Sequence, residues 1–180
     1  HMGGLNGTVT TAQTVSLDLS TLGATNNISQ RIGDTNYSDV QWWLEWYTAT
    51  GATAVTVTVN VTYNDGTTGA LTGASIAASR PASFMLSLNA LVPAASSGKY
   101  IRAVNNVTLS ATTGTAGSFG VTATRPRMTL AAPIANMKFV ADWAQLGFPE
   151  IFNESCLFPI VLTSTTSTGT VRGGGKISHG

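Results

Sequence analysis

The chain has 180 residues, a formal net charge of +1 and only 9% charged residues. Ordinary globular proteins carry about 25% charged residues, so the composition excludes a charged disordered chain and argues against a protein built from Glu- and Lys-rich helices. A near-neutral chain also lacks the basic field that attracts nucleic acid, and we expect no nucleic-acid partner.

Cysteine usage and hydropathy narrow the class further. Cys156 is the one cysteine, which excludes an intramolecular disulfide and a cysteine zinc cluster. No apolar run is long enough to span a membrane and no secretory leader is visible, so we expect no membrane partner. His1-Met2 looks like a cloning remnant, and residues 1–14 as a whole predict a polar N-terminal arm.

Residues 40–63 carry the strongest strand pattern in the chain. An aromatic run at 40–47 is followed at 54–63 by β-branched residues that alternate with polar ones. The small, polar residues 48–53 between the two halves predict a hairpin connection. The period of two assigns one set of side chains to the core, namely Val40, Trp42, Leu44, Trp46, Val55, Val57, Val59, Val61 and Tyr63.

Shorter strands are predicted on both sides of this segment. Alternation indicates strands at 15–19, 67–80, 83–88, 99–111 and 119–123. Residues 20–39 contain several Gly and Asn residues and predict a long connection. Asn64-Asp65-Gly66 has the residues that favour the positive φ angles of a tight turn. A change of phase at Asn105-Asn106 predicts a β-bulge.

The pattern changes after residue 127. Residues 128–156 are compatible with one short helix and an apolar loop, and 157–163 predict an edge strand because this segment contains Pro159. Residues 164–180 form a tail rich in Gly, Ser and Thr. With about eight strands, at most one short helix and no βαβ rhythm, we predict an all-β protein, a single antiparallel β-sandwich or jelly roll over 15–163.

Few residues suit catalysis or metal binding. The two histidines, His1 and His179, are both terminal, so a Ser or Cys nucleophile would lack its usual base. Residues 34–39 have the composition of a calcium loop but lack the glycine and the distal glutamate of an EF-hand. Glu45 lies in the aromatic run, where the alternation favours an outer-face position over a catalytic role. We therefore predict no enzymatic activity, no metal and no other cofactor.

Two groups of residues are candidates for contact with partners. Trp43 and Tyr47 share the outer face of the aromatic strand, where they would form a subunit contact or a stacking platform for sugar, with the contact favoured. The second group is the apolar loop, which comprises Leu146, Phe148, Pro149, Ile151 and Phe152. Exposed apolar residues of this kind usually mark a contact site.

Five segments have a similar pattern of strand-forming residues, namely 42–47, 57–66, 100–102, 117–122 and 143–170. In these strand patterns the chain resembles small structural proteins of tailed bacteriophage virions. The resemblance implies a jelly-roll or sandwich module of the head, neck or tail, found in the virion and, during assembly, in the host cytoplasm. Such a module acts by forming homo-oligomers, with trimers favoured, and by docking on the major capsid protein or other virion proteins. The alternative is a carbohydrate-binding module that uses Trp43 and Tyr47.

The prediction that the protein binds no metal is directly testable. A chelator should leave the melting temperature unchanged, because the chain offers neither internal histidines nor clustered cysteines as ligands. Thermal unfolding with EDTA and with added calcium measures the effect. A melting temperature that rises with calcium would show that residues 34–39 form a cation site after all.

Overall fold

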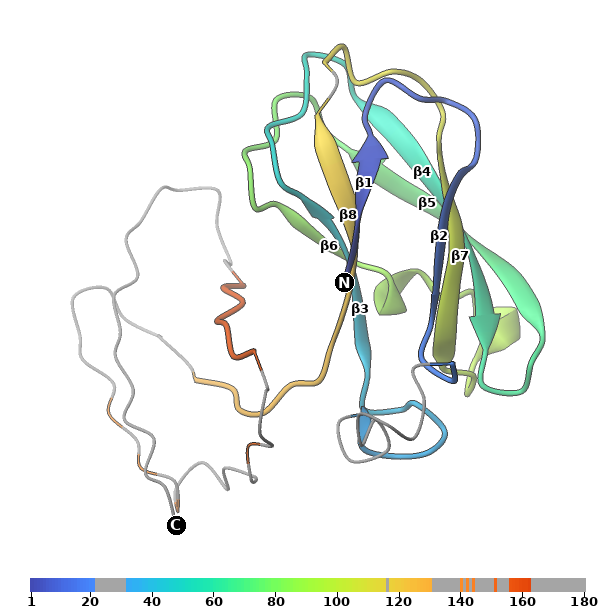
Figure 1. The fold of residues 1–180 in the computed structure, drawn as a ribbon, viewed down its shortest axis with the longest axis vertical. Helices are drawn as coiled ribbons and strands as arrows, with labels where there is room; N and C mark the ends of the chain where they lie inside the picture. The colour runs from blue at the N-terminus through green and yellow to red at the C-terminus, as the bar shows by residue number, and fades with distance from the viewer. Residues whose placement is uncertain are drawn as a thin grey trace. The chain divides into compact units, whose positions relative to one another are not determined.

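The computed structural model describes residues 1–21, 32–115, 117–130, 140, 142, 144, 151 and 156–162. The chain divides into two compact units, His1–Pro149 and Glu150–Gly180. All eight strands of the described residues belong to the first unit, where they form two facing sheets (Figure 1). The described parts contain no helix that is both long and apolar enough to cross a bilayer.

The two sheets have four strands each. The strands are β1 (Met2–Asn6), β2 (Gln13–Asp18), β3 (Gln41–Trp46), β4 (Val55–Tyr63), β5 (Thr68–Ile76), β6 (Met85–Ser87), β7 (Ile101–Leu109) and β8 (Ser118–Thr124). Two 3-10 turns, η2 (Asn89–Leu91) and η3 (Ala94–Ser96), lie between β6 and β7. One sheet has the order β1-β8-β3-β6 and the other the order β2-β7-β4-β5.

The pairing of the strands defines a jelly roll. Strands β1 and β8, β2 and β7, β3 and β6, and β4 and β5 form four antiparallel pairs. Two more antiparallel pairs, β3 with β8 and β4 with β7, join these ribbons into the two sheets. A double-sheet jelly roll has this eight-stranded arrangement. The predicted all-β sandwich or jelly-roll class is therefore confirmed.

The core lies between the sheets and contains every residue that the alternation in 40–63 assigned to it. Trp42 and Trp46 are completely buried, and the Trp46 ring packs against Phe119 of β8 with centroids 4.0 Å apart. The indole Nε1 of Trp42 donates a 2.8 Å hydrogen bond to the carbonyl oxygen of Ile101. Because Ile101 begins β7, this bond ties the two sheets together.

The predicted hairpin between the two halves of 40–63 is wrong. Strand β3 pairs with β8 and β6, whereas β4 pairs with β5 and β7 in the opposite sheet. The intervening segment crosses from one sheet to the other, and Gly51 lies so close to Thr113 that a Cβ on Gly51 would collide with the Thr113 carbonyl. Both strands face one core, so their alternation is the same whether they pair or lie opposite each other.

The hairpin in this region is formed by β4 and β5. Its turn contains Gly66 at φ +83, and the Gly66 amide donates to the carbonyl oxygen of Tyr63 at 3.0 Å. The tight turn predicted at 64–66 is therefore confirmed. The bulge predicted in β7 is also present, because Asn60 pairs with Asn106 while Val61 pairs with Val104, which leaves Asn105 as the extra residue.

The edge strands of both sheets are irregular or short. Register shifts interrupt β1, β2 and β5, and each shift contains a residue with positive φ, namely Gly4, Ser16 and Gly73. Edge strand β6 is only three residues long. Bulges and short strands at sheet edges hinder the addition of strands from other molecules. Charged side chains, another common protection of sheet edges, are scarce in this chain.

Two segments differ from their predictions. Part of the predicted N-terminal arm is strand β1, which pairs with β8. The sequence Met-Gly-Gly-Leu-Asn lacks the alternation that predicts a strand. The predicted edge strand at 157–163 is not found, since residues 156–162 have no strand conformation. Pro159 interrupts the amide donors that a ladder would require there.

Strand β4 allows a matched test of the core. Val59 is fully buried and paired on both sides, whereas the neighbouring Thr58 points outward and is half-buried. Val59→Ala should lower the free energy of unfolding by about 1 to 3 kcal/mol through lost burial and a small cavity. Thr58→Ala should change it by no more than about 0.5 kcal/mol. Urea denaturation of both variants measures the difference, and equal losses would mean that both faces of β4 are covered.

Candidate functional site

The outer face of β3 carries the aromatic residues singled out in the sequence. Trp43 and Tyr47 both lie on this face and are half-buried, with Glu45 between them in the chain. Trp43 is opposite Thr122 of β8, and Glu45 is opposite Gly120. The face is therefore built from alternate residues of two adjacent strands, and the predicted orientation of Trp43 and Tyr47 away from the core is observed.

The ring of Trp43 is fixed by a polar bond. Its indole Nε1 donates to the hydroxyl oxygen of Thr124 at 2.9 Å, and the Thr124 hydroxyl donates to the carbonyl oxygen of Gln41 at 3.3 Å. The indole donor is thus satisfied by the protein itself. What remains available to a partner is the apolar surface of the ring, which suits stacking or packing.

Among the described residues, Glu45 has one side-chain hydrogen bond. The hydroxyl of Thr122 donates to its Oε2 at 2.8 Å, and the Thr122 side chain is almost fully buried beneath the outer face. Within the described part of the chain, no basic side chain forms an ion pair with Glu45. Three other carboxylates do form ion pairs, in the pairs Asp18–Arg102, Asp39–Arg125 and Asp65–Lys99.

Tyr47 packs where β1 and β8 approach each other. A Cβ on Gly120 would collide with both the Tyr47 hydroxyl and the carbonyl oxygen of Met2, so glycine is required at this close approach. The His1 ring lies 5.4 Å from the Tyr47 ring, and its Nδ1 is 3.1 Å from the Thr122 hydroxyl. Burial, and secondly the negative charge of Glu45, raise the pKa of Tyr47 above the ordinary tyrosine value.

The apolar loop of the sequence analysis is only partly described. Ile151 is half-buried. Leu146, Phe148, Pro149 and Phe152 lie outside the described residues, so their assignment to a contact surface stays a prediction. The structure therefore places Trp43 and Tyr47 together on one face but gives no relation between them and this loop.

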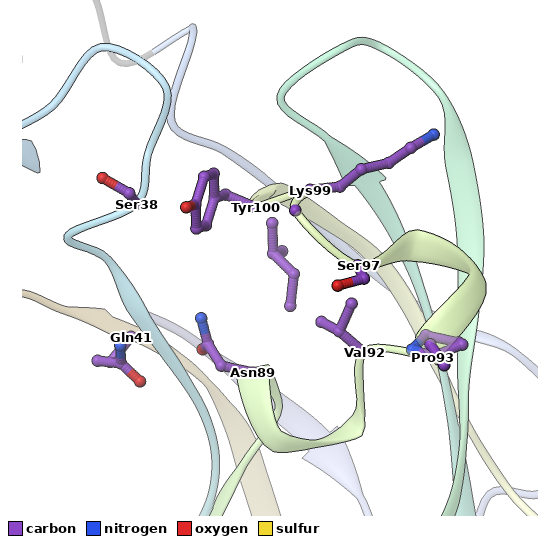
Figure 2. A pocket seen from close by; sticks show the side chains of 11 residues that line it. Ser38, Gln41, Asn89, Val92, Pro93, Ser97, Lys99 and Tyr100 are labelled. Atoms are coloured by element: carbon purple, nitrogen blue, oxygen red, sulfur yellow. The ribbon is translucent and has the colours of Figure 1, made fainter.

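A second feature, which the sequence did not predict, is a neutral hollow at one end of the sandwich. It has a volume of about 340 Å³ and is lined by residues from the segment before β3 and the start of β3, from the η2–η3 region and from the start of β7. Figure 2 shows Tyr100, Ser38 and Gln41 around this space, with Lys99 extending away from it. Lys99 instead forms an ion pair with Asp65, at 2.8 Å.

Part of the lining of this hollow is structural. The Asn89 side chain accepts from the amide of Trp42 at 2.6 Å and donates to the carbonyl of Val40 at 3.0 Å, which fastens η2 to β3. Strand alternation gives no signal for such a hollow, because it arises where three loops meet. The Asn89 bonds span 47 and 49 positions of sequence.

The outer face of the other sheet is also neutral. Along β4 it carries Thr56, Thr58, Asn60 and Thr62. The Asn60 amide donates to the Asn106 side-chain oxygen at 2.8 Å, and the Asn105 amide donates to the Thr62 hydroxyl at 3.1 Å. Neighbouring side chains thus satisfy one another across the strands. This face offers hydroxyl and amide groups and no nucleophile with an adjacent base.

The described residues hold no cluster of three or more His, Cys, Asp or Glu side chains that could bind a metal ion. Comparisons of the chain with protein-family models, with curated protein sequences and with solved structures give no match. The candidate sites are therefore characterised by their own chemistry.

The electrostatic link between Glu45 and Tyr47 can be measured. Glu45→Gln should lower the pKa of Tyr47, because a negative charge beside the ring disfavours the phenolate and its removal relieves that effect. Burial of the ring remains, so the pKa should stay above that of a free tyrosine. Carbon NMR of the tyrosine rings during a pH titration, assigned with Tyr47→Phe, measures the shift. An unchanged pKa in Glu45→Gln would contradict this link, and Asp65→Asn serves as the control.

Proposed function

We propose that the protein is a non-enzymatic structural protein of a tailed bacteriophage virion, which acts by oligomerising and by docking on capsid or other virion proteins. The observation that carries the proposal is a jelly roll whose interior is filled by apolar side chains and whose outer faces along β3 and β4 carry few charged side chains. Jelly rolls occur in viral capsid proteins, lectins and cupins. Since a fold hosts many functions, the choice among these rests on the side chains.

The side chains argue against a cupin-like enzyme. Trp42, Trp46 and Phe119 belong to the apolar core, and all three are inaccessible to solvent. A catalytic centre inside the sandwich would need space and polar ligands at that place. Neither is provided by the core residues, so any activity of the described unit belongs to its surface.

The surface favours contacts with other proteins through the faces of the sheets rather than through the edge strands. Bulges or shortness disrupt the edge strands, which opposes the joining of sheets from two molecules. The faces are nearly free of charge, and this low repulsion favours close contact with other proteins. We propose a closed oligomer, with a trimer favoured, in which Trp43, Tyr47 and the apolar loop at 146–152 are contact residues.

A carbohydrate-binding module is the second candidate. The observation that favours it is the neutral hollow, whose lining includes the Tyr100 ring together with the hydroxyl of Ser38 and the amide of Gln41. An aromatic ring with neutral hydrogen-bonding groups suits a sugar, which has both apolar C–H surfaces and hydroxyls. Size-exclusion chromatography with light scattering separates the candidates, since a monomer that binds glycans would favour this one.

The contribution of the apolar loop can be tested by charge insertion. Phe148→Asp should weaken the oligomer or its docking while the sandwich stays folded, because a carboxylate in an apolar contact loses hydration without gaining a partner. Light scattering reports the mass, and far-ultraviolet circular dichroism reports the fold. If Phe148→Asp unfolds the isolated protein, the loop belongs to the intramolecular core and the contact assignment is wrong.

A further inference from the structure

Three alternate residues of β3 and its end form a row on the outer face, Trp43, Glu45 and Tyr47, called here the β3 row. Alternate residues of a strand are about 7 Å apart and point to the same side. The carboxylate of Glu45 therefore lies between two aromatic rings on one surface. All three side chains are half-buried, so the row is part of a packed surface rather than a set of free side chains.

The charge of Glu45 is not neutralised by the described residues. Its one hydrogen bond comes from the neutral hydroxyl of Thr122. Strands β8 and β6 flank β3, and the residues opposite Glu45 on them are Gly120 and Met85, which carry no charge. The single hydrogen bond from Thr122 replaces only part of the hydration that a half-buried carboxylate loses, so a positive group placed above the row would stabilise it further.

The rings beside Glu45 favour the same kind of ligand. Aromatic faces attract cations that lie within about 6 Å of the ring centroid. A guanidinium or ammonium group that reaches Glu45 would also lie close to the rings of Trp43 and Tyr47, because each is only two residues away. The space next to Tyr47 admits a further side chain, because the His1 ring lies there with its centroid 5.4 Å from that of the Tyr47 ring.

We propose that the β3 row is the docking site for a basic side chain, arginine or lysine, of a partner protein. The carboxylate pairs with the cation and the rings pack against its stem and its charged head. A second copy that docked with this row across a two-fold axis would bring two Glu45 carboxylates together, so the occupant is a different surface. The inference rests on the proposed docking role and adds the chemistry of the partner to it.

A pair of small probes tests the row without a known partner. Acetyl-arginine-amide and acetyl-citrulline-amide have nearly the same shape but differ in charge. Titration at low ionic strength, followed by nitrogen–proton NMR, should give shifts for the arginine probe at the Trp43 indole and at the amides of Glu45 and Tyr47. The citrulline probe should bind more weakly by about fivefold, because it lacks the charge. Equal binding of the two probes, or no shift at the row, would overturn the proposal.

Two matched variants separate the local effect from the change in net charge. Glu45→Gln keeps the shape of the side chain and should weaken arginine binding about fivefold. Asp34→Asn removes the same charge elsewhere, and its amide oxygen can still accept from the amide of Asn36, so binding should stay unchanged. Equal weakening in both variants would show a general charge effect and overturn the proposal.

Two further measurements complete the test. His1→Ala should strengthen arginine binding, because the His1 ring lies on part of the row. Methyl glucoside should not shift the Trp43 indole, and a saturable shift would identify a sugar platform instead of a cation site. Light scattering tests the proposed assembly separately. A protein that is monomeric but still binds the arginine probe would support the cation site at the β3 row and contradict the proposed oligomer.

Discussion

The structure depends on the burial of Trp42 and Trp46 between the two sheets. Both side chains project from the same face of β3, and both are fully inaccessible to solvent. Trp46 packs on Phe119 of the neighbouring β8, while Trp42 reaches across the core and donates to the Ile101 carbonyl of the opposite sheet. Aromatic side chains bury a large apolar area, so these two largely determine where the sheets lie relative to each other within the sandwich.

The rest of the surface follows from the low charge of the chain. With only 9% charged residues, the outer faces are polar through hydroxyl and amide groups, which bond to one another across strands, as Asn60 does with Asn106. Sheets with so few charged side chains need other protection against unwanted extension by further strands. Bulges with positive φ in β1, β2 and β5 supply it, because an irregular edge cannot pair continuously with another strand.

The filled interior confines interaction chemistry to the surface of the sandwich. The β3 row and the neutral hollow differ in kind: the first combines aromatic rings with one unpaired carboxylate, and the second combines an aromatic ring with neutral polar groups. The row lies on regular strands, where neighbouring bonds such as Trp43 to Thr124 hold the side chains in place. A surface held in this way loses little conformational entropy on docking, which favours its use as a contact.

The sequence by itself determined which side chains are buried and where several turns and bulges occur. Alternation assigned Val59 to the core and Trp43 to the outside, and Asn64-Asp65-Gly66 and Asn105-Asn106 marked the turn and the bulge. Only the tertiary structure decided which strands are neighbours. A period of two specifies the buried face of a strand but not its sheet, so β3 and β4 were wrongly expected to pair. The surroundings of Glu45 were hidden for the same reason, since Thr122 lies 77 positions away and meets Glu45 only because β8 pairs with β3.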